Sequence, residues 1–160
     1  TNEAYLAGLC DVYTTDASGL AANRTTVPDP SAHLILPELV SEEPLGPVSR
    51  PGDDVWGDIV RWTLNAMIIA EELGITSDNA AAMAADADAS AGVKRLLGVE
   101  GGYGSMLGLS DDAFLNSLSQ VGNYGESFAR NVGPETAVGL DRGLNALWTD
   151  GGILYAPPFR

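Results

Sequence analysis

The chain has 160 residues, 45% of them hydrophobic, and this length and composition are typical of one globular domain with a hydrophobic core. Its 22 acidic and 8 basic residues give a formal net charge of -14 at pH 7, which argues against nucleic acid or an anionic membrane surface as a partner. No apolar run approaches the roughly 18 residues of a membrane-spanning helix.

The first part of the chain is predicted to contain a short helix and a buried strand. Residues 1–7 are typical of the last turns of a helix, and Gly8 fits the left-handed position after such an end. Strand-forming residues follow at 9–13, and turn and helix-start residues come next. We therefore expect the backbone to leave a sheet here and to enter a short helix over residues 18–24.

Asp16 lies at the end of this predicted strand. Because ligands in open α/β sheets bind beyond the carboxyl ends of strands, Asp16 is a candidate for holding the positive group of a ligand. The hydroxyl groups of Thr14 and Thr15 are its hydrogen-bonding neighbours. Asp is also a preferred N-cap residue, and the local sequence by itself favours capping of the following helix as the role of Asp16.

A single histidine and a single cysteine limit the chemistry of any site. His33 begins a second predicted strand over residues 33–36, where a lone imidazole is more often a surface residue than a ligand. Cys10, in a predicted buried strand, is typically a small hydrophobic residue. One residue of each kind cannot assemble the usual transition-metal cluster, so we expect no metal site and no cofactor.

A proline-rich segment precedes the clearest helix of the chain. Residues 37–52 contain four prolines and should be largely extended, either as a connection between two structural regions or as a surface loop. The helix is predicted over residues 53–73, where Asp53 or Asp54 can cap its start and Gly74 can follow its end. Apolar residues along one face predict a core helix: Val55, Ile59, Trp62, Ala66, Ile69 and Leu73.

The remaining residues are predicted to be mostly helical. The glycine-rich segment 98–108 lacks the Lys-Ser/Thr ending of a nucleotide-binding loop, which argues against phosphate binding. Asn123 starts a helix with Glu126 at its third position, a spacing typical of a capping box. Glycines and prolines over residues 151–158 predict an irregular, docked tail.

Several stretches spread along the chain carry a family resemblance. Near the N-terminus and in the connector they are Ala4–Asp16, Glu43–Pro47 and Gly52–Trp56. The most specific stretches are close to the C-terminus: Val121–Glu126, Asn131–Pro134, Gly143–Trp148 and Gly151–Arg160. Together they resemble the general L-amino-acid-binding periplasmic proteins of ABC transporters. The resemblance covers the whole chain, which corresponds to only the second half of a full-length member of that family.

The resemblance implies an α/β fold. The chain would be the C-terminal portion of a two-lobed periplasmic binding protein, with few strands near the N-terminus and a mostly helical remainder. Residues 1–40 would form part of the second ligand-binding lobe, and residues 41–52 would cross between the lobes. Residues 53–160 would return to the first lobe and add a helical C-terminal extension.

The resemblance also implies a function in the periplasm. The protein would be the solute-binding component for L-amino-acid import by an ABC transporter, present as a C-terminal fragment. Family members hold the α-carboxylate and α-amino groups of a free amino acid, and the acidic residue that takes the amino group corresponds to Asp16. A buried ammonium needs a charged partner, so the resemblance favours ligand contact over capping.

The implied partners follow from the same resemblance. They are a free L-amino acid, the membrane subunits of the transporter, and either the missing N-terminal half or a second copy of this chain. The missing half would carry the arginine that clamps the carboxylate and the disulfide partner of Cys10, so we expect no closed site from these residues alone. Leu9 stands where the family usually has arginine, a change we expect to affect a surface contact.

A small serine hydrolase is the alternative from another functional class. It would use Ser18, or Ser105 as a second candidate nucleophile, with His33 as the base and Asp16 as the orienting acid. The chain has no Gly-x-Ser-x-Gly nucleophile elbow, which argues against this alternative.

Overall fold

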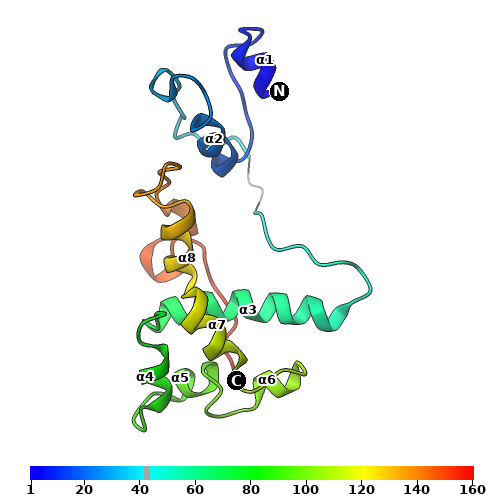
Figure 1. Ribbon diagram of the computed structural model, residues 1–160, viewed down its shortest axis with the longest axis vertical. Helices are drawn as coiled ribbons and strands as arrows, with labels where there is room; N and C mark the ends of the chain where they lie inside the picture. Colours follow the sequence, from blue (N-terminus) through cyan, green and yellow to red (C-terminus); the bar gives the residue numbers. More distant parts are fainter. Residues whose placement is uncertain (42–43) are drawn as a thin grey trace. The chain divides into compact units, whose positions relative to one another are not determined.

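The computed structural model describes residues 1–41 and 44–160, and the regular structure of these residues is helical (Figure 1). The α-helices are α1 (Asn2–Leu6), α2 (Ala17–Arg24), α3 (Asp54–Glu72), α4 (Ala80–Ala85), α5 (Ala91–Leu96), α6 (Tyr103–Met106), α7 (Ala113–Val121) and α8 (Tyr124–Asn131). Single 3-10 turns lie at Pro30–Ala32, Gly143–Asn145 and Trp148–Asp150. None of the described helices is both long and apolar enough to cross a membrane.

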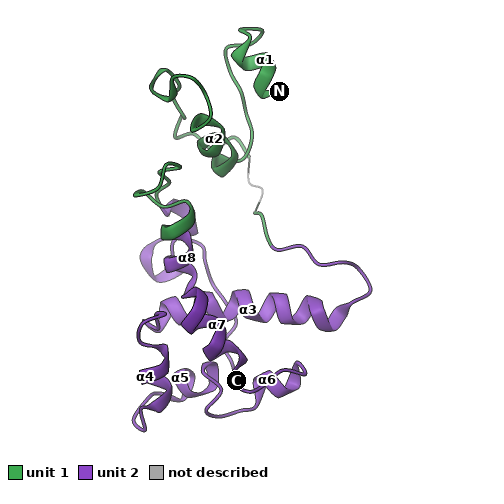
Figure 2. Ribbon diagram, viewed as in Figure 1, with its two compact units in different colours: residues 1–46, 129–141 green, residues 47–128, 142–160 purple. Residues whose placement is uncertain are grey.

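The chain divides into two compact units (Figure 2). Unit 1 comprises residues 1–46 and 129–141, and unit 2 comprises residues 47–128 and 142–160. Glu43, which begins the connector motif, lies outside the described residues, as does part of the predicted crossing over residues 41–52. The assignment of residues to the two lobes of a binding protein stays a prediction.

The two strands predicted near the N-terminus are wrong for the described residues. Residues 9–13 and 33–36 form no ladder, although His33 is extended at φ -117° and ψ 123°. Cys10 is exposed and not buried. Local residue preference is enough for an extended backbone, but a strand is held by hydrogen bonds to a neighbouring strand, and the described part of unit 1 supplies none.

In unit 2, the helix predicted over residues 53–73 is confirmed as α3. The Asp53 carboxylate accepts a hydrogen bond from the Trp56 N–H at 3.0 Å, and Gly74 adopts the left-handed conformation at φ +69° after the helix. The second half of α3 faces the core through Ala66, Ile68, Ile69 and Ala70. At the start of the helix, Val55 and Trp56 are 63% and 54% exposed, so the predicted core face is confirmed only from Trp62 onward, where Trp62 packs against the buried cluster.

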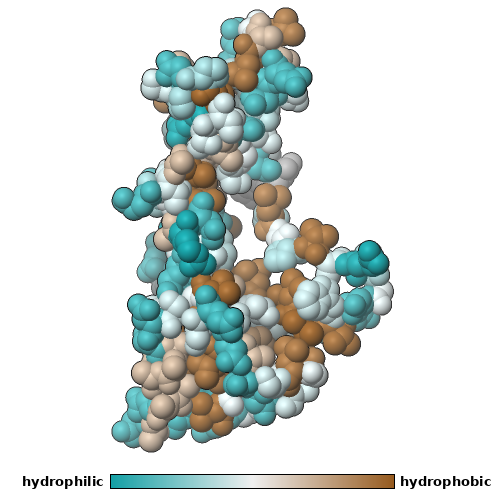
Figure 3. Space-filling model, in the orientation of Figure 1, coloured by the Kyte–Doolittle hydropathy of each residue, from teal (hydrophilic) through white to brown (hydrophobic). Residues whose placement is uncertain are grey.

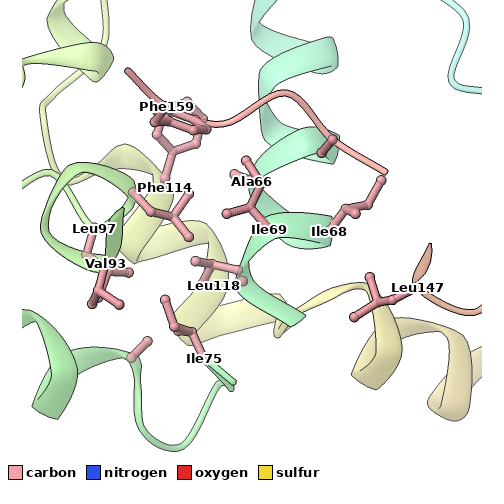
Figure 4. Close-up of a cluster of buried hydrophobic side chains, with 14 residues drawn as sticks. Ala66, Ile68, Ile69, Ile75, Val93, Leu97, Phe114, Leu118, Leu147 and Phe159 are labelled. Carbon is pink, nitrogen blue, oxygen red and sulfur yellow. The ribbon is translucent and has the colours of Figure 1, made fainter. Parts of the chain in front are cut away.

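The core of unit 2 lies between α3, α4, α5 and α7 (Figure 4). Its largest fully buried side chains are Ile75, Leu96, Leu97, Phe114 and Leu118. The C-terminal tail completes this core, because the Phe159 ring meets the rings of Trp62, Tyr103 and Phe114 edge-on with centroids 5.1–5.2 Å apart. The predicted docked tail is therefore confirmed.

The predicted capping box at the start of α8 is also confirmed. The Asn123 N–H donates to Glu126 Oε2 at 2.8 Å, and the Glu126 N–H donates to Asn123 Oδ1 at 2.9 Å. Glu126 also accepts a hydrogen bond from the Ser77 hydroxyl at 2.7 Å, and the Asn123 side chain donates to the Ile75 carbonyl at 2.8 Å. The cap thus joins α8 to the segment that follows α3.

The glycine-rich segment 98–108 folds onto Ser110 and Asp111. A side chain at Gly98 or Gly104 would collide with the Asp111 or Ser110 carbonyl oxygen, respectively, so these glycines permit close backbone approach. The Ser105 N–H and hydroxyl both donate to Asp111 Oδ1, at 3.0 and 2.7 Å. The segment therefore makes a structural turn.

The replacement Ser105→Ala is expected to raise the pKa of Asp111 toward its ordinary value. The Ser105 hydroxyl, and then its N–H, hold that pKa below the usual range. The hydrogen bonds from Ser105 to the Asp111 carboxylate stabilise the folded state at pH values above the ordinary pKa of Asp. This contribution is lost as the pH falls through the lowered pKa of the folded state. An NMR pH titration measures the change. Ser110→Ala is the control, since Ser110 lowers the pKa of Asp112; an unchanged Asp111 pKa in Ser105→Ala would contradict the assignment.

Candidate ligand-binding site

Asp16 immediately precedes α2 in unit 1. It holds the N-cap position with φ -51° and ψ 142°, and its backbone carbonyl accepts a hydrogen bond from the Leu20 N–H at 2.8 Å. The residue is half-buried, and its side chain makes no capping hydrogen bond to the helix. Side-chain capping, which the local sequence favoured, is therefore wrong.

Thr15 lies over the first turn of α2, beside Asp16. A Cβ added at Gly19 would lie 3.3 Å from the Thr15 methyl carbon, so glycine at this position leaves room for the Thr15 side chain. Thr14 and Thr15 are exposed. The structure thus places the three predicted ligand-binding residues on one short loop that leads into α2.

Tyr13, the residue before Thr14, links this loop to α1 and α2. The Tyr13 hydroxyl, one residue before Thr14, accepts a hydrogen bond from the Asn23 side chain of α2 at 3.3 Å. The Tyr13 ring lies 6.2 Å from the Tyr5 ring of α1, and the Tyr5 hydroxyl is hydrogen-bonded to His33 Nδ1 at 2.6 Å. His33 is therefore a structural hydrogen-bond partner of Tyr5. No local sequence signal indicates this contact, because the two residues are 28 positions apart.

The loop has the chemistry to bind an ammonium group. A carboxylate forms charge-assisted hydrogen bonds with an ammonium, and neighbouring hydroxyl oxygens can accept its remaining N–H bonds. Within the described residues, no group of three His, Cys, Asp or Glu side chains is placed to hold a metal ion.

The described residues do not form the catalytic triad that the serine hydrolase alternative requires. Nδ1 of His33 is engaged by Tyr5, and the hydrogen bonds of the described residues include none from His33 to Ser18 or Asp16. The Ser105 hydroxyl donates to Asp111 Oδ1, so it already takes part in a structural hydrogen bond. A nucleophile, a base and an orienting acid in mutual contact are the minimum for this chemistry, so the alternative lacks support.

The structure of this chain is similar to that of a solved periplasmic binding protein. A periplasmic binding protein of an ABC transporter from Brucella ovis, solved with glutathione bound, superposes with a TM-score of 0.91 at 46% identity, over 99% of this chain and 50% of that chain. The described fold is therefore that of about half of a periplasmic binding protein. No protein-family model matches the chain.

Curated relatives indicate which kind of periplasmic binding protein the chain is similar to. The glutamate/glutamine/aspartate/asparagine-binding protein BztA of Rhodobacter capsulatus is 53% identical over 98% of this chain, and the general L-amino acid-binding periplasmic protein AapJ of Rhizobium johnstonii is 53% identical over 99% of it. Along its whole length, the chain is homologous to the amino-acid-binding periplasmic proteins of ABC transporters, which confirms the resemblance seen in the sequence. The chain spans 46% and 47% of the length of these two relatives.

Proposed function

We propose that this chain supplies one part of the ligand site of a periplasmic solute-binding protein that delivers L-amino acids to the membrane subunits of an ABC transporter. The observation that carries the proposal is Asp16, a half-buried residue whose side chain makes no capping bond, in a chain homologous to amino-acid-binding proteins. A helix whose N-cap Asp side chain accepts no hydrogen bond forgoes about 1 kcal/mol of local stability. A role of the same carboxylate in ligand binding would explain why that hydrogen bond is not made.

In this proposal, Asp16 binds the α-ammonium group of the ligand, and Thr14 and Thr15 accept its remaining hydrogen bonds. Residues 1–40 belong to the second lobe, residues 41–52 form the crossing, and residues 53–160 belong to the first lobe and its extension. The groups that hold the α-carboxylate come from the other half of the protein. Glutathione, present in the Brucella ovis structure, carries a free α-ammonium and α-carboxylate on its γ-glutamyl residue, so the same recognition suits it.

The replacement Asp16→Asn tests this role in a protein that contains both halves. It removes the charge but keeps the size of the side chain, so we expect the affinity for an L-amino acid to fall by about 1.5–3 kcal/mol, roughly 10- to 150-fold. Isothermal titration calorimetry measures the change.

Asp11→Asn provides a matched control for Asp16→Asn. Asp11 is an exposed carboxylate in the same N-terminal segment, and its replacement should leave the affinity within about twofold. Unchanged affinity in Asp16→Asn, or an equal loss in both variants, would show that Asp16 does not bind the ligand.

A further inference from the structure

A pocket in unit 1 is lined by the end of α2, by the segment that follows α2 and by residue 137. It measures about 550 Å³, within the usual size range of small-molecule sites. Its polar lining includes Arg24, Ser31 and His33, and its apolar lining consists of Pro30, Leu34 and Ala137. Figure 3 shows a similar mixture of hydrophilic and hydrophobic residues on the surface of unit 1, in the upper part of the view. A ligand of matching chemistry would carry both a polar group and an apolar body.

The charged lining of this pocket is opposite in sign to the net charge of the chain. The chain has 22 acidic residues, 8 basic residues and a single histidine. Arg24 and that histidine, His33, both line the pocket, whereas no Asp or Glu does so among the described residues. A guanidinium without a carboxylate beside it in the lining attracts an anion. The pocket is therefore suited to a ligand with a negatively charged group.

The Arg24 side chain is available for such a ligand because other groups satisfy the end of α2. The Ala22 carbonyl accepts hydrogen bonds from the Thr25 N–H and hydroxyl, at 3.1 and 2.8 Å. The Asn23 carbonyl accepts the corresponding pair from Thr26, at 3.0 and 2.8 Å. Arg24 is half-buried, and its side chain makes no ion pair with another described residue. An anion in the pocket would give this guanidinium charge-assisted hydrogen bonds.

His33 can supply a second hydrogen-bond donor to the pocket. Its Nδ1 is bonded to the Tyr5 hydroxyl at 2.6 Å. When that hydroxyl donates, Nε2 carries the ring hydrogen and is the donor left for a ligand. The Asp29 carboxylate interacts electrostatically with His33, but its Oδ1 accepts the Ser31 N–H and hydroxyl, at 3.1 and 2.6 Å. These hydrogen bonds hold the Asp29 carboxylate on Ser31, and Asp29 does not line the pocket.

We propose that this pocket binds a small organic carboxylate. The Arg24 guanidinium matches a carboxylate because its N–H groups can donate to both oxygens, and the His33 ring adds a further donor. Pro30, Leu34 and Ala137 provide contacts for the apolar body of the ligand. Inorganic phosphate is a poorer match, because it has no apolar body to cover these three residues. This second site goes beyond the proposed amino-acid site and does not depend on it.

The first test titrates benzoate into a protein that contains both halves and follows the backbone amide signals by NMR. Benzoate has a carboxylate and an apolar ring but lacks the ammonium group of an amino acid. We expect saturable binding with signal shifts at residues 24–34, and at least 10-fold weaker binding of benzamide, which has nearly the same size without the charge. Three outcomes would overturn the proposal: no saturable binding at these residues, equal binding of benzamide, or tighter binding of inorganic phosphate.

Arg24→Gln tests the role of the guanidinium in the same titration. The replacement removes the charge and keeps much of the side-chain length, so it should weaken benzoate binding at least 10-fold. Arg50→Gln is the matched control, because Arg50 is exposed, has no ion pair with another described residue and does not line the pocket. It should leave the affinity within twofold. Equal effects of the two replacements would show that Arg24 does not bind the carboxylate.

A second pair of variants tests the pocket without changing Arg24. Ala137 lines the pocket and is exposed, so replacements there are compatible with folding. Ala137→Glu adds a carboxylate to the lining, whereas Ala137→Gln adds a side chain of nearly the same size without the charge. We expect Ala137→Glu to bind benzoate at least 10-fold more weakly than Ala137→Gln, because like charges repel. Equal affinities of the two variants would contradict binding of a carboxylate in this pocket.

Discussion

Phe159→Ala is expected to destabilise unit 2 by about 3–5 kcal/mol, the usual cost of removing a buried phenyl ring. Phe159 is only 7% exposed although it is the penultimate residue, and its ring meets those of Trp62, Tyr103 and Phe114. Its loss would leave a cavity among these rings and would release the tail from the core. Urea unfolding followed by circular dichroism and tryptophan fluorescence measures the free energy of unfolding.

Tyr155→Ala is the matched control for Phe159→Ala. Tyr155 is an aromatic residue of the same tail but is 65% exposed, and truncation of such a residue should change the free energy of unfolding by less than about 1 kcal/mol. Phe159→Leu should fall between the two, because it keeps part of the buried volume. Similar losses for Phe159→Ala and Tyr155→Ala would mean that the tail contributes no specific packing.

Arg142→Met is expected to destabilise unit 2 by about 3 kcal/mol, near the lower end of the range for breaking a buried ion pair. The Arg142 guanidinium donates to both oxygens of Glu71 at 2.8 and 3.1 Å and to the Asn145 carbonyl at 2.8 and 3.0 Å. It also lies 5.4 and 5.3 Å from the ring centroids of Tyr124 and Phe128. Thermal or urea unfolding of the variant measures the loss.

A double-mutant cycle separates the ion pair from the other contacts of Arg142. Glu71 is 17% exposed, so Arg142→Met leaves a largely buried carboxylate without its partner. The double variant with Glu71→Gln should therefore lose less stability than the sum of the single variants. Arg61→Met, which removes an exposed pair with Asp58, should cost at most about 0.5 kcal/mol. Additive single losses would indicate that Arg142 stabilises unit 2 only through its contacts other than the ion pair with Glu71.

The ion pair between Arg142 and Glu71 also restricts which residue fits at position 125. A Cβ at Gly125 would lie 2.8 Å from Glu71 Oε1 and 3.0 Å from an Arg142 guanidinium nitrogen. The sequence alone identifies Gly125 only as a residue of low helix propensity inside a predicted helix. Its role depends on two residues that are 54 and 17 positions away, so only the folded structure reveals it.

The candidate site was partly predictable. The position of Asp16 at the start of a helix follows from local residue preferences, and the family resemblance predicts that it contacts the ligand. Whether its carboxylate caps the helix is a matter of side-chain geometry, and the structure decided this against capping. The tether from Tyr5 to His33 joins distant residues, and the sequence offered no signal for it.

The sequence by itself determined several helix ends of this protein. Gly8 and Gly74 adopt the left-handed conformation, Asp53 caps α3, and Asn123 and Glu126 form a capping box, as their local patterns predict. Each of these features depends on residues within a few positions of one another. The physical reason is that a helix satisfies its backbone hydrogen bonds within one segment, so its signals are local.

Only the tertiary structure decided which extended segments become strands and which apolar faces become core. Residues 9–13 and 33–36 have strand-like sequences but no neighbouring strand among the described residues, and the start of α3 is exposed whereas its second half faces the core. Phe159 fills the core of unit 2 although 45 positions separate it from Phe114. Sheet ladders and packed rings require groups that are distant in the sequence, so one segment's preferences cannot specify them.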